Sequence, residues 1–188
     1  MKNDGQVNSD DIEQLVEASQ RAERGAFDEL VRLYQRRAMK VAVKVLGDSD
    51  EAAEAVQQGF VSAYLKIGKL RDASRFDAWL LKIVSNAAIS RRRAVKRRFE
   101  RIRIAEGYED KNAVGPAENC KARELKEAIQ QAMLKLSAKE ARAIALFGLE
   151  DLSQKQVAEI MGCSVEAVRY HVYKARGKLK VLLKEYLE

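Results

Sequence analysis

The chain has 188 residues, 47% of them hydrophobic and only 6% aromatic, which allows one packed domain or two small helical ones. Its net charge is +7, and a single histidine with two widely spaced cysteines excludes a conventional zinc site. No glycine-rich phosphate loop or nucleophile motif is present, so we expect no enzymatic activity, no cofactor and no metal. The polar, acidic N-terminus and the lack of a long apolar run exclude a signal peptide and a membrane span, which predicts a cytoplasmic protein with reduced thiols.

The first half of the chain has apolar residues at three- and four-residue steps, the spacing of amphipathic helices. Residues 1–9 lack this spacing, and we expect them to be disordered. A glycine follows each of the first three helical stretches and is expected to end it. The expected helices span about residues 10–24, 27–46, 48–67 and 75 into a basic run. Together they predict an all-α domain over residues 10–104.

Capping patterns mark several helix starts. Asp48 with Glu51, and Ser137 with Glu140, have the spacing of a capping box, in which two side chains satisfy each other's backbone N–H groups. Ser74 is the expected N-cap of the fourth helix. These patterns predict where the chain enters each helix.

Periodicity fades over residues 105–120, which contain two glycines and the only proline and have an acidic bias. This composition predicts a flexible linker. Helical spacing returns after it and predicts a second small all-α domain over residues 121–188. The expected architecture is therefore two helical domains joined by a flexible linker.

Positive charge is concentrated in two separate blocks. Residues 91–103 hold eight basic side chains and one acidic, and residues 164–184 hold six basic and one acidic. Residues 1–30 have the opposite bias, with eight acidic and three basic side chains. Two basic blocks favour two contact regions on a nucleic acid, although each alone is also typical of a solvated helix face.

The segment Ser153–Arg176 has the pattern of a helix-turn-helix. Ser153 and Gln156 form a capping box, Gly162 stands at the turn, and Ser164 caps the second helix. Such a second helix can enter the DNA major groove, and the alternative is an ordinary helical hairpin. Its expected core-facing residues are Val165, Val168, Val172, Ala175, Leu179 and Leu182.

Four segments, in this order and spacing, resemble the extracytoplasmic-function (ECF) sigma factors of bacterial RNA polymerase. The resemblance extends from about residue 11 to 183. The segments are FDELVRLYQ at Phe27–Gln35, DEAAEAVQQGFVSAY at Asp50–Tyr64, FDAWLLKIVSNAAISRRR at Phe76–Arg93 and LEDLSQKQVAEIMGCSVEAVRYHVYKARGKL at Leu149–Leu179.

The resemblance implies a non-enzymatic factor that directs promoter-specific transcription initiation. Residues 10–104 would correspond to sigma region 2, and residues 121–188 to region 4. The implied partners are core RNA polymerase, through the clamp helices of its largest subunit and its flap, promoter DNA, and an anti-sigma factor supplied as a separate chain.

The resemblance also assigns roles to residues of the first domain. Contacts to polymerase fall on Glu54, Gln57, Gln58 and Val61, whose polar stripe could equally be a solvated helix face. Capture of a flipped base of the −10 element falls on Leu70, Arg71, Asp72, Ala73, Ser74 and Asn86. Phosphate contacts fall on Arg91, Arg92, Arg93, Lys96, Arg97 and Arg98. Phe76 and Trp79 could stack on bases, but their helical spacing favours core packing.

In the second domain, the resemblance assigns the −35 element to the second helix of the helix-turn-helix. The residues assigned to it are Arg169, Tyr170, His171, Tyr173, Lys174, Arg176 and Lys178. Half-buried packing is an equal alternative for His171. The chain departs from the family pattern at Leu70, Asp72–Ala73, Glu166–Ala167 and Tyr170–His171, so the preferred −10 and −35 bases are not carried over.

One other function class fits the second domain. An independent helix-turn-helix regulator with a helical dimerisation or sensor domain would have the same C-terminal motif. The FxxWL block at Phe76–Leu80 and the loop before it favour the sigma factor, because a repressor has no need of them.

Overall fold

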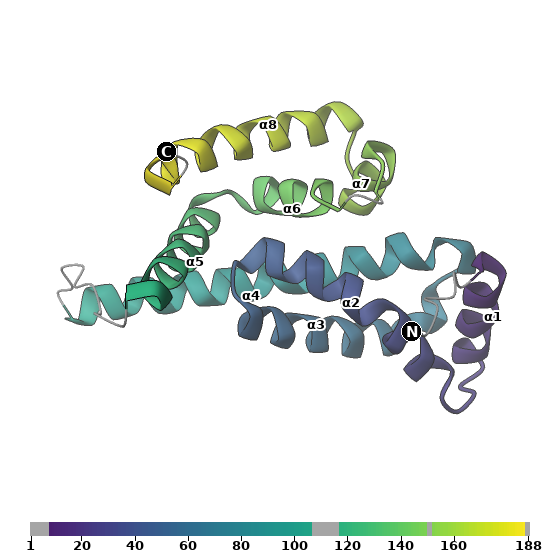
Figure 1. Ribbon diagram of the computed structural model, residues 1–188. Coiled ribbons are helices and arrows are strands. Elements are labelled where there is room, and N and C mark those ends of the chain that lie inside the picture. The colour runs from purple at the N-terminus through teal and green to yellow at the C-terminus, as the bar shows by residue number, and fades with distance from the viewer. Residues whose placement is uncertain (1–7, 107–116, 150–151, 187–188) are drawn as a thin grey trace.

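A computed structural model describes residues 8–106, 117–149 and 152–186, with side chains described for 8–102, 123–149 and 152–186. Every regular element in these ranges is helical, which confirms the expected all-α class (Figure 1). Among them, no helix has the length and apolar character needed to cross a membrane. The elements are α1 (Ser9–Gln20), α2 (Ala26–Leu46), α3 (Ser49–Tyr64), η1 (Ile67–Lys69), η2 (Ala73–Arg75), α4 (Phe76–Glu106), α5 (Ala117–Lys135), α6 (Ala138–Phe147), α7 (Gln154–Met161), α8 (Val165–Leu182) and η3 (Lys184–Tyr186).

The first half is built on a packed core between α2, α3 and α4, with α1 across one end (Figure 1). Phe76 is only 1% exposed and meets Tyr34 edge-to-face at 5.2 Å between ring centroids. Trp79 lies beside it, with ring centroids 5.9 Å apart. Phe76 is therefore a core residue rather than a platform for bases, as its helical spacing predicted.

Two predicted caps differ from the observed ones. Asp72, not Ser74, caps the turn before α4, because its carboxylate accepts hydrogen bonds from the Ser74 N–H at 3.1 Å and the Ser74 hydroxyl at 2.5 Å. Asp48 caps α3 as expected, but Glu51 does not return a bond to it and instead pairs with Arg91 and Arg98. At Ser74 a contact within the turn replaces the expected cap, and at Glu51 ion pairs with another helix replace the expected bond.

The second half has the predicted helix-turn-helix geometry. Ser153 and Gln156 make both bonds of the capping box, at 2.9 and 3.3 Å, and Gly162 has the left-handed φ of +68° that the turn requires. The box at Ser137 and Glu140 is also complete, at 2.7 and 3.2 Å. These local predictions were correct because the interacting residues are three apart in sequence.

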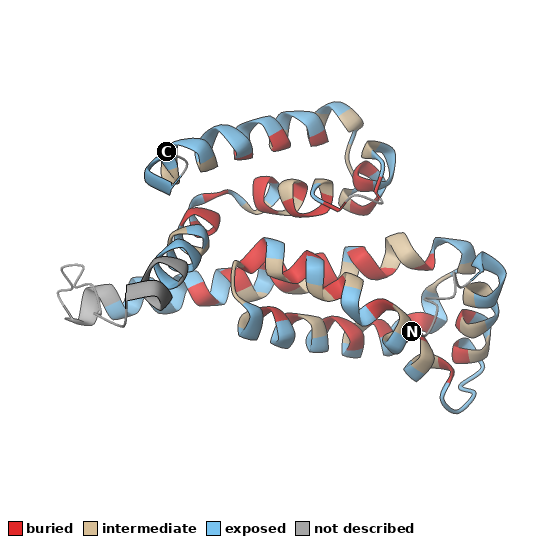
Figure 2. Ribbon diagram, viewed as in Figure 1, coloured by how far each residue is buried: buried red, intermediate tan, exposed pale blue. Residues whose placement is uncertain are grey.

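The two halves pack directly on each other and share buried residues. Helices α6 and α7 lie on α2 and α4, and α8 lies beyond them (Figure 1). In one cluster Leu46 and Ile89 pack with Met133, and in another Val41 and Leu81 pack with Leu146. Figure 2 shows buried residues on both sides of this contact. Because α2 and α4 are apolar on more than one face, they support two cores at once.

Gly47, the residue that ends α2, lies close to the backbone of α5. Its φ is +70°, and an added Cβ would lie 2.9 Å from the Cα of Gln130. A side chain therefore does not fit there. The predicted linker, 105–120, lies largely outside the described residues, and its two ends belong to α4 and α5.

Candidate nucleic-acid interface

Helix α8 separates buried and exposed residues along its length. Val168 and Val172 are at most 5% exposed and hold the helix against α6 and α7. On the outer side, Tyr170 is 57% exposed and Tyr173 is 76% exposed. Lys174 places its ammonium 5.9 Å from the Tyr170 ring centroid. This side presents aromatic and cationic groups, the types that contact base edges and phosphates.

Not all of the predicted −35 residues lie on this open face. His171 is half-buried, and its ring meets Tyr170 edge-to-face at 5.6 Å. Arg176 is exposed but lies over the Phe147 ring at 5.2 Å. Arg169 is exposed, and its Nε donates to the Gln154 side chain at 2.8 Å. This bond uses only the Nε–H of Arg169 and leaves the four N–H donors of its terminal nitrogens for other contacts.

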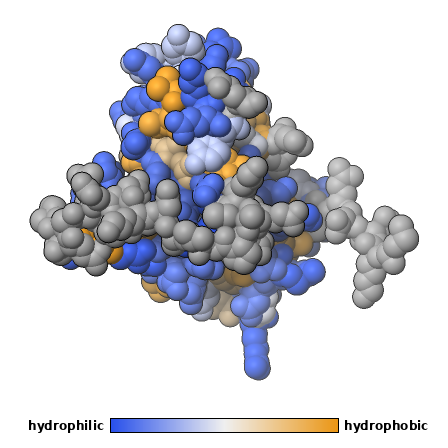
Figure 3. Space-filling view, turned by 60° about the vertical axis from the view of Figure 1, so that its left-hand side comes forward, coloured by the Kyte–Doolittle hydropathy of each residue, from blue (hydrophilic) through white to orange (hydrophobic). Residues whose placement is uncertain are grey.

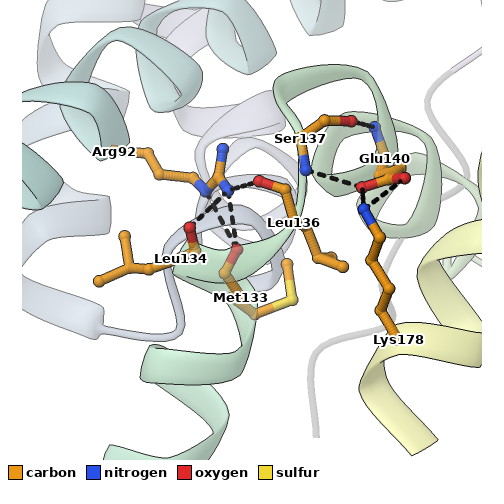
Figure 4. Close-up of polar contacts among 7 residues, drawn as sticks. All are labelled: Arg92, Met133, Leu134, Leu136, Ser137, Glu140 and Lys178. Atoms are coloured by element: carbon orange, nitrogen blue, oxygen red, sulfur yellow. Dashed lines mark hydrogen bonds and ion pairs between the residues drawn. The ribbon is translucent and has the colours of Figure 1, made fainter. Parts of the chain in front are cut away.

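Lys178 is paired with a residue of α6, although its own side chain is 46% exposed (Figure 4). Its ammonium donates to both carboxylate oxygens of Glu140, at 2.9 and 2.8 Å. Burial opposes ionisation of Glu140, but the bonds from Lys178 and Ser137 outweigh it and hold the Glu140 pKa below its usual range. In this conformation Lys178 stabilises the α6–α8 contact and is not a group held ready for DNA.

A groove with a volume of about 370 Å³ runs between α3 and α4. Asn86, predicted to contact the −10 element, lies on its α4 wall, and Glu54 and Gln58, predicted to contact polymerase, lie on its α3 wall. Arg91, predicted to contact phosphate, also lines the groove. The structure thus brings together residues that the sequence assigned to three different roles. The lining residues are Glu54, Ala55, Gln58, Ser62, Lys66, Ile83, Asn86, Ala87, Ser90 and Arg91.

The outer face of α3 is more apolar than the sequence pattern indicated. Gln57 is exposed and Val61 is 49% exposed, as expected of surface contacts. Tyr64 and Leu65, which the sequence analysis did not assign to a site, are 60% and 73% exposed. Their type at helical spacing from Val61 was the available signal, because exposed apolar clusters mark interaction surfaces.

The loop between α3 and α4 carries the remaining predicted −10 residues. Arg71 and Ser74 are exposed, whereas Leu70 and Ala73 are half-buried. The hydrogen bonds of Asp72 are directed at Ser74, so Asp72 shapes the loop. None of these loop residues lines the α3–α4 groove in the structure, although Lys66 at the start of the loop does.

The described basic side chains of the run on α4 differ in their surroundings: some are exposed, two pair with the same acidic side chain, and one is buried. Arg93, Lys96 and Arg97 are exposed, and Arg91 and Arg98 both pair with Glu51. Arg92 was predicted to bind phosphate, but it is only 5% exposed in this structure.

Arg92 reaches the end of α5, where three main-chain carbonyls converge on it (Figure 4). Its Nη2 donates to Met133 at 2.8 Å and Leu134 at 3.3 Å, and also to Leu136. Burial, reinforced by neighbouring Arg93, lowers the pKa of Arg92. The side chain bonds to carbonyls at the end of α5, where Met133 also accepts from the Leu136 N–H at 3.2 Å, so it cannot reach phosphate while α5 and α6 lie on α4.

A second patch of apolar surface lies on the C-terminal part of α8. Val181 is 77% exposed beside Tyr173, in a groove of about 530 Å³ edged by Lys135 and Lys174. Figure 3 shows hydrophobic side chains among hydrophilic ones on the upper part of the molecule. Among the side chains described, no group of three potential metal ligands is present.

Two family models match this chain. The model described as "Sigma-70 region 2" covers residues 30–98, and the one described as "Sigma-70, region 4" covers residues 126–179. The first match contains α3, the loop and the basic run, and the second contains the helix-turn-helix. The α3–α4 groove with its loop lies within the region 2 match, and the helix-turn-helix lies within the region 4 match.

Full-length relatives are also similar. The RNA polymerase sigma-H factor of Pseudomonas aeruginosa is 31% identical over 183 residues, covering 93% of this chain and 95% of that protein. The ECF RNA polymerase sigma factor SigW of Bacillus subtilis is 26% identical, covering 93% and 97%. Among solved structures, the sigma factor RpoE of Bartonella quintana, in complex with the anti-sigma factor NepR, has a TM-score of 0.58 and 26% identity, covering 85% of this chain and 98% of that one.

Proposed function

Because the chain belongs to the ECF sigma factors of bacterial RNA polymerase, and as such directs transcription initiation, we propose how its surfaces divide that work. The observation that carries the proposal is the pairing of an exposed aromatic and cationic face on α8 with a polar groove between α3 and α4. One face would read duplex DNA, and the other would hold an unpaired base.

The outer side of α8 reads the −35 element in the major groove. Arg169 can grip a guanine through two hydrogen bonds, and Tyr170 and Tyr173 can contact thymine methyl groups or phosphates. Lys174 adds charge beside Tyr170. His171, Arg176 and Lys178 have partners inside the protein, so they support the helix or contact the DNA backbone.

The α3–α4 groove and the loop between these two helices act on the −10 element. A base that has left the stack needs a pocket with hydrogen-bonding groups for its Watson–Crick edge. Asn86 and Gln58, on opposite walls, offer both donors and acceptors. The loop residues Leu70, Arg71 and Ala73 lie nearby along the chain and would hold the flanking nucleotides.

Core polymerase docks on the outer face of α3. Gln57 and Val61 are exposed there, and Tyr64 and Leu65 extend the surface with apolar area. Glu54 and Gln58 line the groove, at the border between the polymerase-binding and DNA-binding faces. The clamp helices of the largest subunit are the proposed partner for this face, and the flap is the proposed partner of the second half.

We propose that residues 10–104 and 121–188 act as separate units on the promoter, joined by 105–120. Of residues 1–9, which were expected to be disordered, Asn8 and Ser9 belong with the first unit, because they cap and begin α1. Exposed Arg93, Lys96 and Arg97 then hold phosphates between the two elements. An anti-sigma factor is a partner, as NepR is the partner of RpoE in their solved complex. Transcription places the protein in the cytoplasm.

Run-off transcription tests the proposal most directly. Core polymerase with and without this protein is supplied with templates carrying candidate promoters, and protein-dependent transcripts are expected. An Asn86→Ala variant should lower open-complex formation, and an Arg169→Ala variant should weaken discrimination at −35. Tight promoter binding by the protein alone, with no stimulation of polymerase, would support the independent regulator instead.

A further inference from the structure

The last residue of α1 contacts the loop that precedes α4. The side-chain amide nitrogen of Gln20 donates to the main-chain carbonyls of Ile67, at 3.0 Å, and Leu70, at 2.7 Å. These bonds join positions 47 and 50 residues apart in sequence. Both partners are carbonyl oxygens, so the amide nitrogen and not its oxygen must face them.

Helix α1 is a firm base for this contact. Val16, one turn before Gln20, is 0% exposed and packs in the same core as Ile67 and Phe76. Ser19 is buried and its hydroxyl donates to the Leu15 carbonyl at 2.7 Å. Because Val16 and Ser19 are buried, the position of Gln20 is fixed, and its hydrogen bonds restrain the loop.

The two carbonyls that Gln20 binds lie where the chain leaves η1 and enters the loop. Leu70 leaves η1 in an extended conformation, with φ −74° and ψ 112°. Arg71 follows it into solvent, and Asp72 then begins the self-bonded turn with Ser74. Asp72 thus fixes the end of the loop near α4, and Gln20 fixes the end near α3. Arg71 is the residue held between the two fixed points.

We propose that Gln20 is a positioning residue for −10 recognition: it sets the direction in which the Leu70–Ser74 loop presents its groups to DNA. The proposal rests on the function proposed above for that loop. Gln20 lies outside the segment that matches sigma-70 region 2, residues 30–98, so that match does not assign it a role. It is exposed and outside the core, so its loss leaves the helices in place.

Three substitutions separate the hydrogen bonds from the bulk of the side chain. Gln20→Met keeps length and removes the donor, and Gln20→Glu places a carboxylate against two carbonyl oxygens. Gln20→Lys restores a donor that can bridge both carbonyls. Gln14→Met is the matched control, because Gln14 is an exposed glutamine on the same helix.

Open-complex formation by reconstituted holoenzyme is followed with a fluorescent base analogue at the −10 element, together with binding to core polymerase and thermal unfolding. A net hydrogen bond is worth a factor of roughly 3 to 10 in an equilibrium constant. Gln20→Met and Gln20→Glu should reduce opening by about that factor. Core binding, melting temperature and response to −35 substitutions should stay as in the parent protein. Gln20→Lys and Gln14→Met should open promoters normally.

Arg71→Ala and Leu70→Ala distinguish the two proposals. If these loop variants impair opening while Gln20→Met does not, Gln20 has no positioning role and the function of the loop stands. If the loop variants also open promoters normally, the assignment of the loop fails and the inference about Gln20 fails with it. If Gln20→Met lost core-polymerase binding by the same factor as open-complex formation, Gln20 would have a general structural role and the inference would be overturned.

Discussion

The guanidinium of Arg92 donates to the main-chain carbonyl of Met133 at 2.8 Å, although the two residues lie 41 positions apart and in different halves of the chain. The contact closes the end of α5 against α4 and buries a charge taken from the most basic segment of the sequence. Any phosphate contact by Arg92 therefore requires α5 and α6 to leave α4. The exposed residues of the run, such as Arg93, need no such change.

Replacing Arg92 should weaken the contact between the halves. Arg92→Met leaves the carbonyl of Leu136 without this donor, whereas Met133 keeps the bond from the Leu136 N–H, and a buried unsatisfied group costs about 1–3 kcal/mol. Removing a desolvated charge offsets part of that cost. We expect a net loss of about 2 kcal/mol in the free energy of unfolding, measured in urea. Arg93→Met, at an exposed neighbour, should change it by less than about 0.5 kcal/mol. Equal effects of the two variants would contradict the assignment of Arg92 to the interface.

Gly47→Ala and Gly177→Ala should act in opposite directions. At Gly47 an alanine must adopt a φ of +70° and place its Cβ 2.9 Å from the Gln130 Cα. The backbone strain alone is about 1–2 kcal/mol, and the clash adds to it. Gly177 lies within α8 with nothing within 4 Å of an added Cβ, so alanine there should stabilise the helix by about 0.5–1 kcal/mol. Denaturant unfolding of both variants checks the signs, and a Gly47→Ala protein as stable as the parent would refute the close approach.

The Glu140–Lys178 pair should make stability depend on pH in the acid range. The folded-state pKa of Glu140 is lowered from its ordinary value of 4.5, so its contribution is present above that value. The contribution is lost as pH falls through the lowered pKa, because the unfolded chain then binds the proton first.

In a Lys178→Met variant the bonds from Lys178 are lost while burial and the Ser137 bonds remain, which raises the carboxyl pKa of Glu140 relative to the parent protein. The difference in unfolding free energy between parent and variant should therefore be largest above pH 4.5 and shrink below it. Lys180→Met, at an exposed position on the same helix, is the control and should show no such pH dependence. A constant difference across the acid range would argue against the pair.

Arg169→Ala and Arg176→Ala should differ in what they do to promoter binding. Loss of a base contact by Arg169 should cost about 1–3 kcal/mol and relax discrimination at one −35 base pair. Arg176 lies over the Phe147 ring and is expected at most on the DNA backbone, so its loss should weaken all promoters alike and lower the salt slope by about 0.9. Holoenzyme binding to promoters with single −35 substitutions, at several salt concentrations, separates the two. If Arg176→Ala lost discrimination between −35 base pairs and Arg169→Ala did not, the two roles would have to be exchanged.

Much of the local structure was predictable because its causes are close together in sequence. Ser153 and Gln156, like Ser137 and Glu140, are three residues apart, and both capping boxes form as expected. The left-handed turn at Gly162 follows from glycine's lack of a Cβ. The apolar steps on α8 correctly placed Val168 and Val172 inside. These features need only the neighbouring turns of the chain.

The site was predictable in its elements but not in its arrangement. The sequence assigned Glu54 and Gln58 to a polymerase surface and Asn86 to a DNA surface, and the packing of α3 on α4 places all three on one groove. Glu51 was expected to bond Asp48, yet Arg91 and Arg98, 40 and 47 residues away, take its carboxylate. No spacing rule covers such pairs, because their distance depends on how two helices cross.

Amino-acid order alone determined the all-α class, the helix-turn-helix and the family, since these follow from periodicity, capping and the succession of motifs. Only the tertiary structure decided which member of a uniform basic run is buried. Arg92 and Arg93 have the same chemistry and adjacent positions, but one step along a helix rotates a side chain by about 100°. That rotation turns Arg92 toward the end of α5 and leaves Arg93 in solvent, and it takes effect only because the second half packs on α4.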